Sequence, residues 1–151
     1  MIKYSHPVKV YYKDIDQMGI VYYSRYFEFF EEARTEMLLS IGLDYAKVED
    51  QGAMLPVIEA HAEYKKGAIF GQNIIIHTQI DELPKVRMKF KYSVVSENTD
   101  ELLMTGHTVH AFTDLKGRPN RFPVRSVGSG FEKKLFSILS KKPDRQCLLC
   151  R

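Results

Sequence analysis

One amphipathic helical pattern dominates the chain and limits the folds open to it. Apolar residues recur at three- and four-residue spacing between residues 24 and 41, the period of a helix with one buried face. Ser24 is a typical N-cap residue, and Gly42 is the glycine expected just after a helix end. The predicted buried stripe consists of Tyr26, Phe30, Ala33 and Met37. We therefore expect a core helix about 27 Å long, enough to cross a small sheet.

Strand patterns lie on both sides of this helix. An alternating side-chain pattern predicts strands over residues 6–13, 55–64 and 85–95. Two more strands are predicted over residues 73–80 and 102–112, each of which follows a turn. A short helix or loop is expected over 44–52, and an amphipathic helix over 124–139. This order predicts an α+β fold, in which an antiparallel five-stranded sheet wraps around one long central helix.

The composition is that of an ordinary soluble protein with a small positive charge. Its 151 residues suit a single domain, expected over residues 1–140, followed by a basic tail over 141–151. The net charge of +3 is too small to indicate a nucleic-acid partner. No run approaches the about 18 apolar residues of a membrane span, and Cys147 and Cys150 in the tail provide no disulfide framework. We expect a cytoplasmic protein without a membrane span.

The turn before the helix carries the residues best suited to catalysis. Asp14 and Asp16 follow the predicted first strand, Gly19 forms a tight turn, and the helix begins near Ser24. Unpaired N–H groups and the positive end of the helix dipole stabilise negative charge at such a helix start. A carboxylate that faces this helix end suits acyl transfer. By residue type alone, both acids would be structural turn residues, and Asp14 is expected to be one.

Four segments resemble one enzyme family. They are residues 14–26 (DIDQMGIVYYSRY), 31–34 (EEAR), 62–66 (AEYKK) and 117–123 (GRPNRFP). Together they are similar to the 4-hydroxybenzoyl-CoA thioesterase family of hotdog proteins, whose relatives include short-chain and fatty acyl-CoA thioesterases of bacteria. The resemblance implies a hotdog fold and a homo-oligomer, dimer or tetramer, with sites at the subunit interface. It also implies an acyl-CoA substrate, hydrolysed to free acid and coenzyme A.

The resemblance assigns roles to single residues around the turn. Asp16 would act on the thioester carbonyl either as nucleophile or as general base for water. The backbone N–H of Tyr23 would polarise that carbonyl, and Gly19 would keep the turn open for the substrate. Many relatives carry a histidine at the position of Tyr23, so any role of that imidazole is absent here.

Basic side chains offer two alternative contacts for the phosphates of coenzyme A. One is the stripe around Lys89 in the predicted strand 85–95, which would otherwise be a solvated outer sheet face. The other is the loop that carries Arg118 and Arg121. The sequence leaves both open.

Other chemistries find little support in the sequence. No G-x-S-x-G nucleophile elbow, phosphate loop or dinucleotide fingerprint occurs. The histidines share no metal-ligand spacing, and His107 and His110 fall on opposite faces of one strand. We therefore expect no metal and no cofactor. An acyl carrier protein thioesterase, a hotdog dehydratase and a non-catalytic acyl-CoA or acyl-carrier binding module are the alternative functions.

Overall fold

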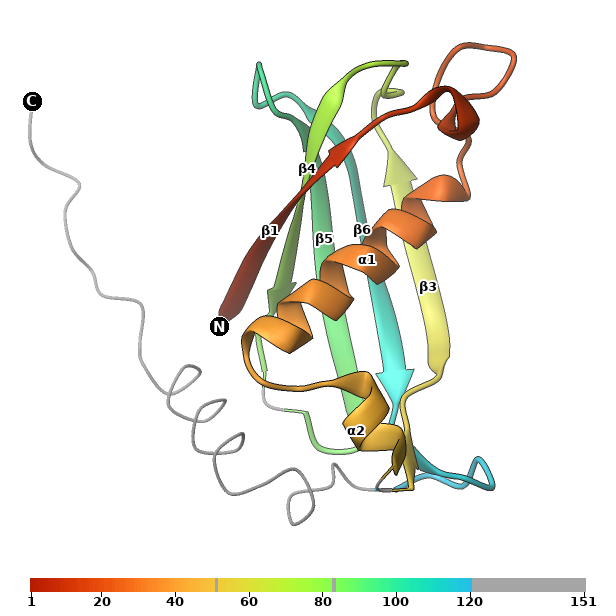
Figure 1. The fold of residues 1–151 in the computed structure, drawn as a ribbon, viewed down its shortest axis with the longest axis vertical. Coiled ribbons are helices and arrows are strands. Elements are labelled where there is room, and N and C mark those ends of the chain that lie inside the picture. Colours follow the sequence, from red (N-terminus) through yellow and green to blue (C-terminus); the bar gives the residue numbers. More distant parts are fainter. Residues whose placement is uncertain (51, 83, 121–151) are drawn as a thin grey trace, which may run out of the picture.

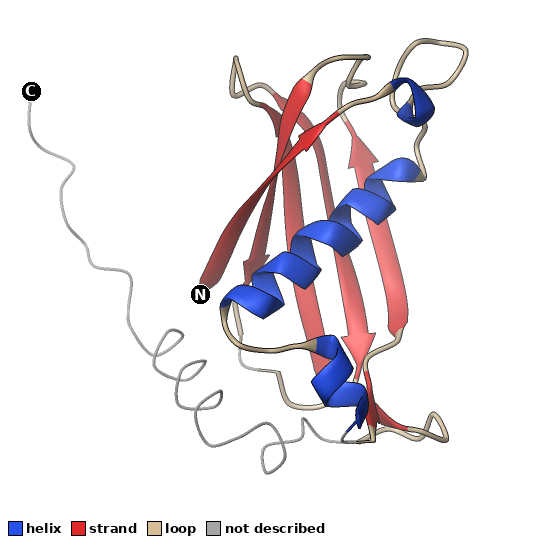
Figure 2. Ribbon diagram, viewed as in Figure 1, coloured by secondary structure: helices blue, strands red, loops and turns tan. Residues whose placement is uncertain are grey.

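An antiparallel sheet and one long helix make up most of the computed structural model, which describes residues 1–50, 52–82 and 84–120. The sheet has five strands in the order β1-β4-β5-β6-β3 (Figure 1). These strands are β1 (Ile2–Lys9), β3 (Val57–Tyr64), β4 (Asn73–Ile80), β5 (Arg87–Ser96) and β6 (Leu102–Ala111). The long helix α1 (Arg25–Ser40) crosses one face of the sheet (Figure 2). The predicted architecture is confirmed.

Short elements complete the described part of the chain. They are the 3-10 helix η1 (Tyr12–Asp14), the helix α2 (Tyr45–Asp50), and the strand β2 (Ala53–Met54), which pairs with β7 (Thr113–Asp114). The helix expected over residues 124–139, and the domain boundary expected at residue 140, lie outside the described residues.

Helix α1 forms where the apolar period predicted it. It spans Arg25–Ser40, with Ser24 at the N-cap position and Gly42 beyond its end at a φ of +89°. The side chain of Ser24 makes no capping hydrogen bond. The buried stripe is the predicted one, Tyr26, Phe30, Ala33 and Met37. With about 1.5 Å of rise per residue, against roughly 4.8 Å between strands, a helix of this length can cross all five strands.

The first strand does not lie where it was predicted. It spans Ile2–Lys9 instead of residues 6–13, because residues 2–5 already pair with β4. The strand ends early because the Tyr11 N–H donates to the Asp14 carboxylate at 2.9 Å, and the Asp14 N–H donates to the Tyr11 carbonyl at 3.0 Å. These bonds close η1. The other four predicted strands of the sheet agree with the structure to within two residues at each end.

Gly106 of β6 leaves room for the ring of Phe30 on α1. The ring of Phe30 on α1 stacks on Tyr92 of β5, with centroids 4.0 Å apart and planes inclined by 4°. A Cβ at Gly106 would lie 2.6 Å from the carbonyl oxygen of His61 and 3.0 Å from the ring of Phe30. A glycine is therefore needed for both β3 and α1 to reach this point. The alternating pattern of residues 102–112 did not indicate it.

A chain of hydrogen bonds is buried beside this contact. The Tyr92 hydroxyl lies 3.0 Å from Thr108 Oγ1, which lies 3.0 Å from His110 Nε2. His110 Nδ1 lies 3.1 Å from the carbonyl oxygen of Leu55, which can only accept, so Nδ1 carries the proton. Burial lowers the pKa of His110 from 6.5 to about 4. The ring is therefore neutral at pH 7, and its Nε2 accepts from Thr108.

We expect His110 to make the stability of the protein pH-dependent in the acid range. Its pKa of about 4 in the folded state lies below 6.5, so between these values the unfolded chain binds more protons than the folded one. The free energy of unfolding should therefore fall by up to about 3 kcal/mol as the pH drops from 6.5 to 4. Urea unfolding at about pH 7.5 and about pH 4.5 measures this change.

The matched variants for this prediction are His110→Asn and His77→Asn. Wild type should lose more stability on acidification than His110→Asn, whereas His77→Asn, which changes an exposed histidine, should behave like wild type. Equal losses in wild type and His110→Asn would contradict the prediction.

Candidate active site

Asp16 and Gly19 form a closed turn between η1 and α1. Asp16 Oδ1 accepts the Met18 N–H at 2.8 Å, and the Asp16 carbonyl accepts the Gly19 N–H at 2.9 Å. The Asp16 N–H donates to the Ile20 carbonyl at 2.9 Å. Gly19 adopts a φ of +75°, which glycine reaches at little cost. The turn at Gly19 is therefore where the sequence predicted it, and one oxygen of the Asp16 carboxylate is held by its own loop.

Asp14 is a structural acid, as predicted. The residue is only 1% exposed. Besides the Tyr11 N–H, its carboxylate accepts from Nε of Arg25 at 3.1 Å and from Nη2 of Arg25 at 2.7 Å. Its carbonyl accepts the N–H of Tyr22 at 2.9 Å. Asp14 thus ties the start of α1 to the end of η1 and has no free oxygen to offer a substrate.

The residues just before α1 present unpaired backbone donors. The Arg25 N–H donates to the Tyr22 carbonyl at 2.9 Å, and the Phe27 N–H donates to the Ser24 carbonyl at 3.1 Å. Within the described part of the chain, by contrast, the N–H groups of Tyr23 and Ser24 have no acceptor. They lie at the positive end of the helix dipole, where a developing oxyanion would be stabilised.

A cavity of about 280 Å³ brings Asp16 and Tyr23 together at this helix start. Tyr26 of α1 and Tyr64 at the end of β3 also line it, as do residues 65–67. The predicted catalytic acid and the predicted carbonyl-polarising residue therefore share one cavity. An acid beside unpaired donors at a helix N-terminus can carry out acyl transfer on a bound ester.

The residues expected to bind phosphates lie elsewhere in the chain. Lys89 lines a different hollow, of about 400 Å³, on the outer face of the sheet together with Arg87 and Lys91. Arg118 is exposed and pairs with Asp114 at 3.5 Å. Arg121 lies outside the described residues. Neither Lys89 nor Arg118 lines the Asp16 cavity of its own chain.

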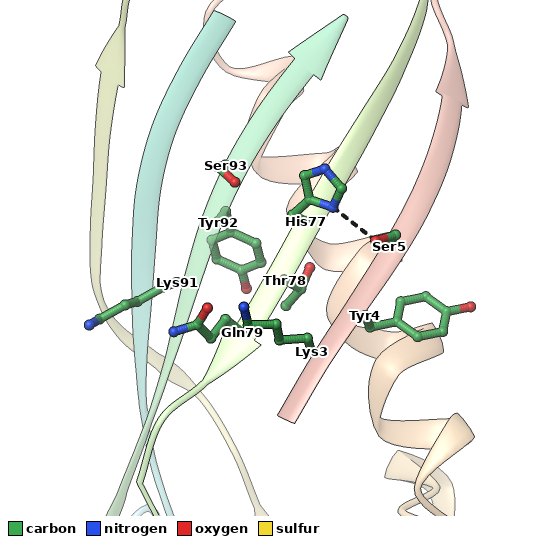
Figure 3. A pocket seen from close by; sticks show the side chains of 9 residues that line it. All are labelled: Lys3, Tyr4, Ser5, His77, Thr78, Gln79, Lys91, Tyr92 and Ser93. Carbon is green, nitrogen blue, oxygen red and sulfur yellow. Dashed lines mark hydrogen bonds between the residues drawn. The ribbon is translucent and has the colours of Figure 1, made fainter. Parts of the chain in front are cut away.

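Figure 3 shows a further hollow of about 400 Å³ on the outer face of the sheet. Ser5 Oγ lies 2.8 Å from His77 Nδ1, across the paired strands β1 and β4. A nucleophilic serine also needs a third group that orients its base, and the described residues give His77 no acidic partner. Lys91, on the rim, pairs with Asp81 at 2.7 Å. We read this hollow as solvated sheet surface.

Neither a metal site nor a membrane-spanning helix occurs in the part of the chain that the structure describes. No three histidine, cysteine or acidic side chains there are placed to hold a metal ion. His61 and His107 do stack across β3 and β6, with centroids 5.1 Å apart, but each pairs with a glutamate. No described helix is long and apolar enough to cross a bilayer.

Sequence reasoning did not single out Tyr64 as a site residue. Its hydroxyl donates to the carbonyl oxygen of Tyr23 at 3.0 Å, and its ring lines the cavity. The available signal was the segment AEYKK, residues 62–66, noted only as part of the resemblance. Nothing in its strand pattern indicates that the end of β3 meets the start of α1.

Comparisons with known proteins show the family to which the chain belongs. Residues 10–137 match the family model described as the thioesterase-like superfamily. Acyl-CoA thioesterase YbgC of Haemophilus influenzae is 32% identical over 123 residues, covering 80% of this chain and 88% of that protein. Acyl-CoA thioester hydrolase YbgC of Escherichia coli is 31% identical over 129 residues, covering 84% and 94%. The structure of a DHNA-CoA thioesterase from Staphylococcus aureus matches with a TM-score of 0.82 at 25% identity, covering 91% of each chain.

Proposed function

The chain belongs to the thioesterase-like superfamily, and we propose that it hydrolyses the thioester of an acyl-CoA to a free carboxylic acid and coenzyme A. The observation that carries the proposal is that Asp16 and Tyr23 line one cavity, and that the Tyr23 N–H has no acceptor among the described residues. The names of the two bacterial relatives, both acyl-CoA thioester hydrolases, support the substrate class.

Asp16 is the one acid among the described residues that line the cavity. As nucleophile, its carboxylate would form a mixed anhydride and expel the coenzyme A thiolate, and water would then hydrolyse the anhydride. As general base, it would take a proton from a water that attacks the same carbon. Negative charge develops on the carbonyl oxygen by either route. One donor such as the Tyr23 N–H stabilises that charge by roughly 3 kcal/mol.

We further propose that Lys89, Arg118 and Arg121 contact coenzyme A phosphates across a subunit interface. This arrangement would explain why Lys89 and Arg118 lie outside the Asp16 cavity of their own chain. Their positive charge suits a ligand that carries several phosphate groups.

Release of free thiol from a panel of short, long and aromatic acyl-CoAs tests the proposed function. Hydrolysis of at least one of them is expected, and the preferred member identifies the acyl group. Saturable binding without turnover of any coenzyme A ester would instead indicate an acyl carrier protein substrate or a non-catalytic binding module.

We also propose a homo-oligomer, dimer or tetramer, that works in the cytoplasm as a single domain over residues 1–140 with a basic tail over 141–151. Strand β3 lies at one edge of the sheet, so one side of it has no neighbouring strand among the described residues. Its large apolar side chains are about half exposed: Val57 48%, Ile58 49% and Tyr64 47%. An edge with so much apolar surface favours pairing with another copy of the chain.

Sedimentation equilibrium at micromolar concentration should therefore show a dimer or larger species. Ile58→Lys places a charge at this edge and should shift the equilibrium towards monomer. Leu39→Lys is a matched control, because Leu39 is 45% exposed but lies on α1. A monomeric wild-type protein, or equal effects of the two variants, would contradict an interface at β3.

A further inference from the structure

We infer that the hydroxyl of Tyr64 is a positioning group that fixes the peptide after Tyr23, and with it the Ser24 N–H, the backbone donor beside that of Tyr23 at the start of α1. The inference rests on the proposed function and adds to it a residue that acts through the backbone. Tyr64 is the last residue of β3, and Figure 1 shows that end of the strand beside the start of the helix.

The carbonyl of Tyr23 lies just outside the hydrogen-bond ladder of α1. The N-cap residue Ser24 supplies the first carbonyl of a helix that begins at Arg25. The Phe27 N–H accordingly donates to the Ser24 carbonyl, at 3.1 Å. Among the described residues, the Tyr64 hydroxyl, at 3.0 Å, is the donor that the Tyr23 carbonyl has. The bond therefore holds the peptide that joins Tyr23 to Ser24.

The start of α1 is held from two sides. On the β1 side, the Asp14 carbonyl accepts the Tyr22 N–H, and the Asp14 carboxylate binds the Arg25 guanidinium. Tyr22 and Arg25, which flank Tyr23 and Ser24, are therefore both anchored. On the β3 side, Tyr64 is the anchor for the Tyr23–Ser24 peptide. The Tyr23 N–H belongs to the preceding peptide, which the bond from the Arg25 N–H to the Tyr22 carbonyl already holds. Without Tyr64 the Ser24 N–H could rotate with its peptide, because no other protein bond from the described residues restrains it.

The ring of Tyr64 is placed independently of its hydroxyl. It packs edge-on against Tyr26, with centroids 5.8 Å apart, and the Tyr26 hydroxyl in turn accepts the Ala68 N–H at 3.3 Å. Burial raises the pKa of Tyr64, so its hydroxyl stays protonated and able to donate at neutral pH. Tyr64→Phe therefore keeps the packing and removes only the bond to Tyr23.

Steady-state thiol release with Tyr64→Phe tests the inference. Loss of one neutral hydrogen bond that positions the Ser24 N–H should lower kcat by about three- to tenfold, with little change in KM or in melting temperature. Tyr12→Phe is the matched control, because Tyr12 is 79% exposed and lies outside the cavity. It should leave kcat unchanged.

A spectroscopic measurement separates positioning from packing. In the Asp16→Asn background, the infrared carbonyl stretch of a bound acyl-CoA reports how strongly the enzyme polarises the thioester. Adding Tyr64→Phe should move that stretch back towards its value in free acyl-CoA, and adding Tyr12→Phe should not. An unchanged kcat in Tyr64→Phe, or an unchanged carbonyl stretch, would overturn the inference.

Failure of the proposed function would look different. Wild type would then hydrolyse no acyl-CoA. In that case the amide resonance of Ser24 still tests the bond directly, because this amide belongs to the peptide whose carbonyl Tyr64 holds. A shift of the Ser24 resonance in Tyr64→Phe that is absent in Tyr12→Phe would support the positioning role, and no shift would overturn it.

Discussion

Asp16→Asn is expected to lower the turnover of acyl-CoA by more than about a hundredfold, because an amide can act neither as nucleophile nor as base. The fold should be retained, since the Asn Oδ1 can still accept the Met18 N–H that closes the turn. Binding of a non-hydrolysable thioether analogue should also be largely unchanged. Initial rates of thiol release, together with calorimetric binding of the analogue, measure both effects.

A second carboxylate-to-amide change serves as control for this prediction. Asp100 is exposed in the turn between β5 and β6 and lines neither the Asp16 cavity nor the Lys89 hollow, so Asp100→Asn should leave turnover close to that of wild type. Near-full turnover in Asp16→Asn would refute the assignment of Asp16 as the catalytic acid.

Asp14→Asn is expected to affect stability instead, with a loss of about 3 kcal/mol in the free energy of unfolding. The carboxylate of Asp14 is buried, and it neutralises Arg25 while accepting the Tyr11 N–H. An amide removes the charge and cannot accept from both partners with the same strength. Chemical denaturation of wild type and variant, compared at the same pH, measures the loss.

The matched control for Asp14→Asn changes a second acid that pairs with Arg25. Glu28 also pairs with Arg25, but its side chain is 55% exposed, so Glu28→Gln should change stability by less than about 1 kcal/mol. If Asp14→Asn and Glu28→Gln lowered the free energy of unfolding by similar amounts, the prediction that the buried ion pair contributes more than the exposed one would be wrong.

The sequence by itself determined the elements that depend on a local period. The stripe from Tyr26 to Met37 identified α1, and alternation identified β5 to within two residues at each end. Periodicity reports which side of an element is apolar, so it predicts burial well. The motif from Asp14 to Tyr26 was specific enough to indicate the family, which the match over residues 10–137 confirms.

The first strand shows the limit of such local reasoning. Its end depends on the Asp14 side chain, which competes for the Tyr11 N–H and draws the chain into η1. A side-chain bond of this kind leaves no trace in an alternating pattern. The prediction for residues 6–13 therefore overran the real end of β1.

Only the tertiary structure decided which residues meet. Asp14 and Asp16 look alike in the sequence, yet one is buried against Arg25 and the other lines the cavity. The bond from Tyr64 to Tyr23 and the close approach at Gly106 both depend on the strand order β1-β4-β5-β6-β3. That order sets β3 at the edge beside the helix start. Contacts between distant segments arise from how the sheet is assembled, which no local pattern of residues encodes.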